Sequence, residues 1–211
     1  MPTAREALLD TAVSALAARP WGEVRMREVA GAAGVSRQTL YNEFGGKDGL
    51  GRALIGRAAD DYLAGIDEAL GTHAVTGQGP VELALWTVRA ARGNALVKAL
   101  LTGFWGDGLP RPGPPRPPVT DGSAGDRAGR PVSPWALPTP AGMLTLARDR
   151  AVAFLRGGHP PEDVTRLETV CEIALRIGLS YAVAPPVAAP SPVGSDAVRL
   201  VREALARHPA C

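Results

Sequence analysis

The sequence predicts an all-α protein in which a small three-helix domain precedes a larger helical domain. Apolar residues recur at helical spacing through most of the 211 residues. No segment has the strict alternation of a half-buried strand. Glycines and prolines divide the apolar stretches into helix-sized pieces. We place the first domain at residues 1–46 and the second at 47–211.

The composition excludes several classes of protein. The formal net charge of +2 is compatible with a nucleic-acid partner but does not indicate one. Neither cysteine, Cys171 or Cys211, lies in a metal-binding pattern, and the three histidines are isolated from one another. The sequence therefore indicates no metal and no cofactor.

No membrane-spanning or secretory segment is expected. A membrane helix needs about 18 or more consecutive apolar residues, and no run in the chain reaches that length. The N-terminal stretch MPTAREALLD contains acidic residues and lacks the apolar core of a signal peptide. We expect a cytoplasmic protein without a membrane partner.

The first third of the chain contains four expected helices. Thr3 and Glu6 form a capping-box pattern at the start of the first helix, and Pro20 marks its end. Glycines separate the third helix from a longer fourth one. The expected helices lie at about residues 3–19, 26–33, 36–44 and 47–71.

The remaining sequence predicts further helices around one unusual segment. We expect a single buried helix at 80–105 and later helices at about 140–155, 161–183 and 195–207. Residues 107–134 are rich in proline and glycine, which predicts a largely disordered loop. A proline-rich ligand at 112–118 for a partner domain is the alternative, but a tolerated insertion is the commoner explanation.

Residues 25–47 have the pattern of a helix-turn-helix. Ala30 is small enough for the next helix to approach closely, and Gly34 can adopt the left-handed turn conformation. Val29, Val35 and Leu40 supply an apolar wedge between the two helices. Helical hairpins with a glycine turn are common, so this pattern alone does not identify a DNA-binding protein. The side chains of the second helix are the more specific signal.

That second helix separates apolar from hydrogen-bonding side chains. At about 100° per residue, Leu40 and Phe44 fall on the inner side. The opposite side carries Arg37, Gln38, Thr39, Tyr41 and Asn42. Arginine and glutamine can contact guanine and adenine edges bidentately, whereas threonine, tyrosine and asparagine commonly reach phosphates. Ser36 can cap the helix and contact a phosphate. The alternative is an ordinary polar helix surface.

The segment MREVAGAAGVSRQTLYNEFGGKDGL, residues 26–50, resembles the DNA-binding region of the TetR family of transcriptional regulators. The close resemblance covers residues 5–55. It rests on five matching groups: Val29-Ala30, Ala33-Gly34-Val35-Ser36, Thr39-Leu40-Tyr41, Phe44, and Lys47-Asp48-Gly49-Leu50. The resemblance implies a helix-turn-helix DNA-binding domain followed by a helical effector-binding and dimerisation domain.

The sequence departs from the family pattern at two places. Arg25-Met26-Arg27 stands where the family usually has a threonine, and Gly46 replaces a serine before Lys47. Arg27 matches a position that can reach DNA, and Lys47 is the expected phosphate anchor. The expected DNA-contacting residues are Arg27, Ser36, Arg37, Gln38, Thr39, Tyr41, Asn42 and Lys47.

The last two expected helices resemble half of a four-helix dimer interface. Small residues recur every fourth position at Ala174, Gly178 and Ala182, and the final helix carries Leu200, Val201 and Ala204. We expect these six residues at a homodimer interface, and Gly178→Leu to produce monomers or aggregates. The alternative is that these helices only close the core of their own chain.

The second domain is also expected to bind an effector. Apolar and aromatic side chains that could line a pocket, with a basic group, are supplied by Trp86, Arg89, Phe104 and Trp105. We expect an apolar or amphipathic small molecule, which can carry one acidic group. The helix from Lys47 links the two domains and is the natural lever between them. Core packing is the commoner role for each of these residues individually.

Two other classes of function compete with a DNA-binding regulator. An enzyme is disfavoured because the sequence has no phosphate-binding glycine loop, no nucleophile elbow and no metal spacing. A helical interaction module would use the proline-rich segment. We expect a regulator, most often a repressor in the family that it resembles, that binds a near-palindromic operator as a homodimer and is released by its effector.

Overall fold

The computed structural model describes residues 3–72, 78–111, 137–158, 163–184, 199 and 203. Among these residues there are helices and turns but no strand, so the predicted all-α class is confirmed. The chain divides into two compact units. The first comprises Met1–Gly56 and Asp107–Pro138, and the second comprises Arg57–Gly106 and Thr139–Cys211. The division by compactness falls inside the fourth helix rather than at its start.

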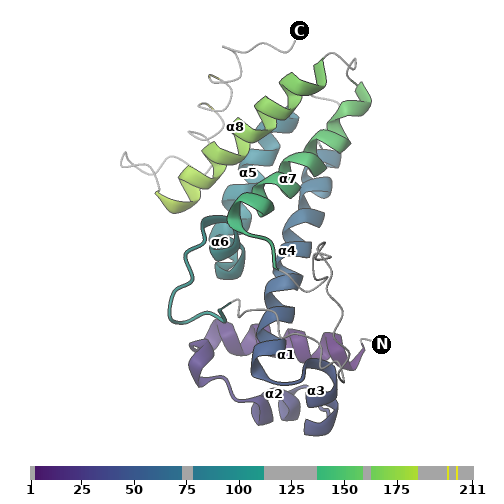
Figure 1. Cartoon of the computed structure of the whole chain (residues 1–211), viewed down its shortest axis with the longest axis vertical. Helices are drawn as coiled ribbons and strands as arrows, with labels where there is room; N and C mark the ends of the chain where they lie inside the picture. Colours follow the sequence, from purple (N-terminus) through teal and green to yellow (C-terminus); the bar gives the residue numbers. More distant parts are fainter. Residues whose placement is uncertain are drawn as a thin grey trace, which may run out of the picture. The chain divides into compact units, whose positions relative to one another are not determined.

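The first unit contains the predicted three-helix arrangement (Figure 1). Its elements are α1 (Ala4–Ala18), the short 3₁₀ turn η1 (Trp21–Glu23), α2 (Met26–Ala32), α3 (Arg37–Phe44) and the first part of α4 (Lys47–Thr72). The capping box is present, with Thr3 accepting from the Glu6 N–H and Glu6 accepting from the Thr3 N–H. Leu8, Leu40 and Leu50 are fully buried and form the centre of this unit.

Glycines fix the turns on both sides of α3. Gly34 has φ 69° and Gly45 has φ 68°, conformations that side chains with a Cβ rarely adopt. Gly49, in the first turn of α4, has a different role. A Cβ on Gly49 would lie 1.7 Å from the Phe44 carbonyl oxygen, so only glycine permits this close junction of α3 and α4.

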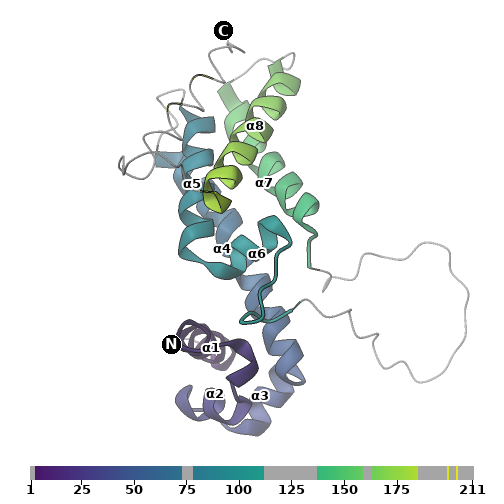
Figure 2. The same ribbon diagram turned by 90° about the vertical axis from the view of Figure 1, so that its left-hand side faces the viewer.

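The second unit contains the rest of α4 and the later helices. These are α5 (Gly79–Gly93), α6 (Ala95–Thr102), α7 (Pro140–Leu155), the 3₁₀ turn η2 (Arg156–Gly158) and α8 (Val164–Val183). Helix α8 lies along α5 and beside α7 in both views (Figures 1 and 2). No described helix has the length and apolarity that crossing a membrane requires.

The single helix expected at 80–105 is wrong, because the structure has two helices there. Asn94 adopts an extended conformation with φ −136° and ψ 112°, which ends α5. Its side-chain oxygen then accepts from the Leu96 N–H at 2.9 Å and caps α6. A Gly-Asn pair inside an apolar run is a signal for such a break.

The small residues of α8 pack inside the chain, against the expectation that they meet a second copy. A Cβ on Gly178 would lie 2.7 Å from the Ala84 carbonyl oxygen of α5 and 3.1 Å from the Thr87 Cβ. Ala174 and Ala182 are buried as well. The dimer-interface assignment of these three small residues is therefore corrected, because α5 already occupies the space beside Gly178. Leu200, Val201 and Ala204 lie outside the described residues.

The predicted loop at 107–134 begins with a packed segment. The Trp21 N–H donates to the Gly108 carbonyl oxygen at 2.8 Å. Pro110 is buried, and its Cβ lies 3.0 Å from where a Cβ of Gly51 would be. Residues 107–110 are therefore part of the first unit and not a free loop, which the proline and glycine content alone did not indicate. The proposed proline-rich ligand at 112–118 lies outside the described residues.

Candidate DNA-binding interface

Helix α3 is short, and its two ends are both capped. The Ser36 Oγ accepts from the Thr39 N–H at 3.0 Å, which satisfies one of the free donors at the start of the helix. The left-handed Gly45 closes the other end, and its N–H donates to the Tyr41 carbonyl oxygen at 2.8 Å. Leu40 and Phe44 are buried, as their positions predicted. The helix is thus held by its inner side and its ends.

The outer side of α3 is exposed. Arg37, Gln38, Tyr41 and Asn42 all have exposed side chains, and Tyr41 is 49% exposed. The Gln38 Nε2 donates to the Asn42 Oδ1 at 2.8 Å, so these two side chains hold each other in place. This face offers a guanidinium, two amides and a phenol hydroxyl within two helical turns.

Thr39 and Ser36 are placed differently from the other predicted contacts. The Thr39 side chain is half-buried, and its hydroxyl lies 2.8 Å from the Ser36 hydroxyl. Both hydroxyls are therefore engaged in the cap of α3. Each hydroxyl has further hydrogen-bonding capacity, since a hydroxyl carries one donor and two acceptor sites.

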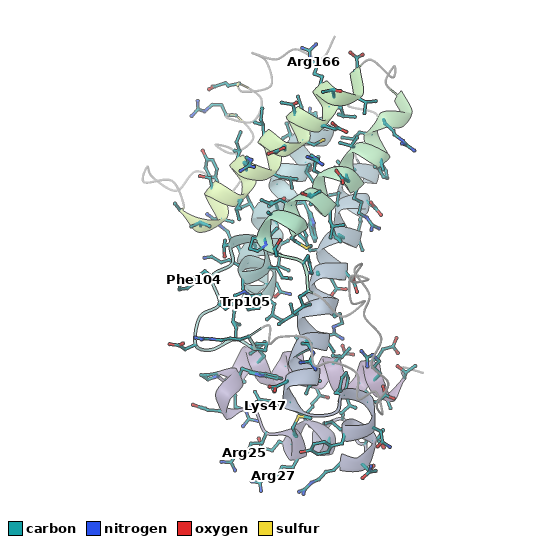
Figure 3. The ribbon with its side chains drawn as sticks, in the orientation of Figure 1. Arg25, Arg27, Lys47, Phe104, Trp105 and Arg166 are labelled. Carbon is teal, nitrogen blue, oxygen red and sulfur yellow. The ribbon has the colours of Figure 1, made fainter. Side chains whose placement is uncertain are left out.

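Two arginines of the first unit have exposed side chains at the start of α2. Arg27 was predicted from the sequence, whereas Arg25 was not. Arg25 occupies the N-cap position of α2, where its side chain makes no capping bond. Neither guanidinium has a hydrogen bond or ion pair with any residue in the part of the chain that the structure describes. Figure 3 labels both side chains at the same end of this unit.

Other cations of the first unit are engaged with the protein itself. Arg5 lies 4.8 Å above the Phe44 ring centroid and 3.6 Å from the Glu43 carboxylate. The Arg19 guanidinium lies 2.5 Å from the Glu28 carboxylate. These pairs join α1 to α3 and to α2, so they help to hold the helices together rather than present free charge.

Lys47 also has intramolecular partners, which the sequence did not indicate. Its Nζ donates to the Gly22 carbonyl oxygen at 2.9 Å and lies 5.4 Å from the Trp21 ring centroid. The side chain is half-buried. The expected phosphate anchor therefore spans from the first residue of α4 to the η1 turn.

The predicted effector-binding residues do not form one enclosed wall in the described chain. The Trp86 Nε1 donates to the Tyr62 carbonyl oxygen at 3.0 Å, and the indole occupies the space that a Gly65 side chain would need. Arg89 is exposed, and Phe104 is 77% exposed. Trp105 is half-buried, and Figure 3 labels it beside Phe104 after α6.

A buried pair of hydroxyls joins α4 and α5 in the second unit. The Tyr62 and Thr87 hydroxyls lie 3.0 Å apart, and the Thr87 hydroxyl donates to the Leu83 carbonyl oxygen. Burial raises the pKa of Tyr62 to about 12. Burial likewise raises the pKa of the Cys171 thiol to about 12, which keeps the thiol protonated. Within the described ranges, no cluster of three or more histidine, cysteine or acidic side chains could hold a metal ion.

Comparisons with known proteins relate part of this chain to one family of regulators. Residues 8–54 match the family model described as bacterial regulatory proteins, tetR family. The HTH-type transcriptional regulator AlkX of Mycobacterium tuberculosis is 39% identical over 66 residues, a match that spans 31% of either chain. The crystal structure of the TetR family repressor AlkX from Dietzia sp. has a TM-score of 0.52 and 20% identity, covering 97% of this chain and 94% of that one. The matched residues include all of α2 and α3, and the fold agrees over nearly the whole chain. The sequence likeness to the tetR family is thus confined to the helix-turn-helix region at residues 8–54, and the likeness over the rest of the chain is one of fold.

Proposed function

We propose that the protein is a sequence-specific DNA-binding transcriptional regulator that places α3 in the major groove. The observation that carries this proposal is the exposed hydrogen-bonding face of α3, fixed from behind by the buried Leu40 and Phe44. An α-helix fits the major groove, where each base pair has a distinct donor and acceptor pattern. The residues proposed to form the DNA interface, by contact or by positioning, are Arg27, Ser36, Arg37, Gln38, Thr39, Tyr41, Asn42 and Lys47.

The side chains of α3 suit two kinds of contact. Arg37 and Gln38 have the bidentate geometry that reads guanine and adenine, and both are exposed. The Gln38–Asn42 hydrogen bond orients the amide before DNA arrives. Tyr41 and the hydroxyls at the N-terminus of α3 suit phosphate oxygens, which set the register of the helix.

The protein is proposed to act as a two-fold homodimer on a near-palindromic operator. One recognition helix covers too few base pairs for useful selectivity, and a two-fold dimer doubles the site. Since Gly178 packs against α5 within the chain, we place the proposed dimer interface on another surface. Ile173 and Ile177 remain half-exposed on α8, and Val183 is 52% exposed. These exposed apolar residues favour a dimer interface on the side of α8 that faces away from α5.

The proposed effector is a small apolar or amphipathic molecule that releases the protein from DNA, so that the protein acts as a repressor. The structurally similar repressor from Dietzia sp. is implicated in the biodegradation of n-alkanes, which supports an apolar effector here. The residues proposed to contact the effector are Trp86, Arg89, Phe104 and Trp105, which do not enclose a pocket in this structure and would have to come together around it. To shift a population from 1:99 to 99:1, the effector must favour the DNA-incompetent state by about 5.5 kcal/mol.

The experiment that tests the DNA proposal is selection of duplexes from a random-sequence pool by the purified protein. The expected result is an enriched near-palindrome with two half-sites about one helical turn apart. Sequencing that finds no enrichment over the starting pool would contradict sequence-specific binding. An enriched single half-site would contradict the dimer while leaving the role of α3 in place.

The effector proposal has a separate test. Thermal-shift measurements with n-alkanes and alkanoic acids of increasing chain length are run with and without the selected duplex. Because linkage is reciprocal, a true effector must bind more weakly when DNA is present, by the same factor by which it weakens DNA binding. Compounds whose affinity ignores the duplex would not be effectors.

A further inference from the structure

The side chain of Lys47 joins the start of α4 to the turn that precedes α2. Its ammonium donates to the Gly22 carbonyl oxygen and faces the Trp21 indole. Both partners belong to η1, the 3₁₀ turn at Trp21–Glu23. An indole face attracts a cation, and a main-chain carbonyl is a strong acceptor, so this arrangement uses the charge within the protein.

The η1 turn is seated on other parts of the first unit. Trp21 is 8% exposed, and its N–H donates to the Gly108 carbonyl oxygen. Val24 is 2% exposed, and its N–H donates to the Trp21 carbonyl oxygen at 3.1 Å. The next residue is Arg25, the N-cap of α2. The position of the turn therefore determines where α2 begins and where its first side chains lie.

The exposed side chains at the start of α2 are cationic. Arg25 and Arg27 are both exposed and have no partner among the described residues. A guanidinium offers a planar pair of donors that matches a phosphate, and it is charged at every pH of interest. Arg25 in particular has an extended backbone and a free side chain at a position where most helices place a capping residue.

We propose that Lys47 is a positioning residue, which holds the η1 turn and thereby the start of α2, and that Arg25 is the phosphate-contacting cation there. The proposal rests on the proposed DNA-binding function and moves the phosphate contact expected of Lys47 to Arg25. Lys47 acts on DNA through Arg25 and the start of α2 rather than through a phosphate of its own.

The salt dependence of DNA binding separates the two roles. A residue that neutralises a phosphate contributes about 0.9 to the slope of log K against log salt. A residue that only positions Arg25 can change the slope only while Arg25 is present. The probe is the duplex that the wild-type protein selects from a random pool. The variants are Lys47→Met, Lys47→Gln and Arg25→Ala, with Arg156→Ala in the second unit as a control that removes one exposed charge.

The expected results differ for each variant. Arg25→Ala should lower the slope by about 0.9, and Lys47→Met should weaken binding roughly tenfold and lower the slope by no more than Arg25→Ala does. Adding Lys47→Met to Arg25→Ala should lower the slope no further. Lys47→Gln keeps a donor for the Gly22 carbonyl oxygen without the charge, so it should bind better than Lys47→Met. Arg156→Ala should match the wild type. If Lys47→Met lowers the slope by about 0.9 more in the Arg25→Ala background, Lys47 contacts a phosphate of its own and the proposal is wrong.

Double variants test whether Lys47 acts through α2. The double variant Lys47→Met/Arg25→Ala should lose less DNA-binding affinity than the product of the two single fold-losses, because both changes remove the same contact. The double variant Lys47→Met/Arg37→Ala should lose affinity by the full product of the two single fold-losses, since Arg37 lies on α3 and does not depend on the η1 turn. Full products in both pairs would mean that Lys47 only stabilises the fold, and would overturn the positioning role.

Failure of the proposed function is a distinct result. If the wild-type protein enriches no duplex, the DNA-binding proposal fails. The positioning role is then judged by hydrogen exchange without DNA. Lys47→Met should accelerate exchange at residues 21–28, and Arg25→Ala should not. Unchanged exchange in Lys47→Met would overturn the claim that Lys47 holds the η1 turn.

Discussion

Helices α3 and α8 each carry a row of residues that stands out in the sequence, and the structure uses the two rows in opposite ways. The polar row of α3 stays exposed, with Arg37, Tyr41 and Asn42 facing solvent. The small-residue row of α8 is consumed inside the chain, where Gly178 meets the backbone of α5. One row is available to a partner, and the other is not.

The difference follows from what each kind of residue requires. A buried hydrogen-bonding group without a partner is costly, so a face of long polar side chains is directed outward or toward a polar ligand. A small residue on a helix indicates only that another helix can pack closely there. It does not say whether that helix belongs to the same chain. The polar row of α3 therefore indicates that a partner binds there. The small-residue row of α8 indicates only that some helix packs closely against it.

The largest expected effect is at Gly178. Gly178→Leu should unfold or severely destabilise the second unit, by about 3 kcal/mol or more, because a main-chain oxygen of α5 cannot move aside. Chemical denaturation measures this loss. Gly71→Ala is the matched control, since its Cβ would meet only the tip of Phe154 at an ordinary 3.7 Å.

Protein concentration decides where Gly178 packs. For a contact within one chain, the stability lost by Gly178→Leu should be the same at low and high protein concentration. A loss that grows with concentration would return Gly178 to the dimer interface, because association stabilises by mass action.

The next effect concerns the α5 surface beside Gly178, where Thr87 meets Tyr62. The Tyr62 phenol ionises near pH 10 when unfolded and near pH 12 when folded, so the unfolded state binds fewer protons in this interval. Stability should therefore fall as pH rises from 10 to 12, by about 2–3 kcal/mol. Tyr62→Phe should abolish that part of the fall. Cys171 acts in the same direction in both proteins and cancels in the comparison. Equal pH profiles for the two proteins would show that Tyr62 is not buried as described.

Substitution on α3 should affect DNA binding and leave the fold unchanged. Arg37→Ala should weaken binding to the selected duplex by about 1–3 kcal/mol and relax the preference at one base pair. Its melting temperature should equal that of the wild type, since the side chain has no partner in the described chain. If Arg37→Ala weakens binding to all DNA sequences equally, Arg37 contacts a phosphate rather than a base.

The smallest expected effect is at the cap of α3. Ser36→Ala removes the acceptor for the Thr39 N–H and should cost about 1 kcal/mol of stability. Ser36→Asp keeps an acceptor and should retain most of that stability. DNA binding should weaken in both variants if the Ser36 hydroxyl contacts a phosphate. A fully stable Ser36→Ala would mean that the cap bond contributes little.

Much of the first unit could be predicted because its signals are local. The capping box at Thr3, the left-handed Gly34 and the buried Leu40 all follow from neighbouring residues and the helical period. The inner and outer sides of α3 were likewise correct. These features do not depend on which distant segment lies nearby.

The errors concern partners that are distant in sequence. Nothing near Lys47 indicates that its ammonium lies on a carbonyl 25 residues earlier in the chain. The seat of Pro110 against Gly51, and that of Gly178 against Ala84, are also contacts between remote segments. The break at Asn94 is the exception, since the Gly-Asn pair is a local signal for it.

The most direct test of the central claim is hydrogen exchange measured with and without the selected duplex. If the exposed face of α3 binds DNA, protection should concentrate in peptides from residues 25–47, and α8 should exchange at the same rate in both samples. Protection confined to α8, or no protection at 36–44 at saturating duplex, would contradict the assignment of α3 as the helix that reads DNA.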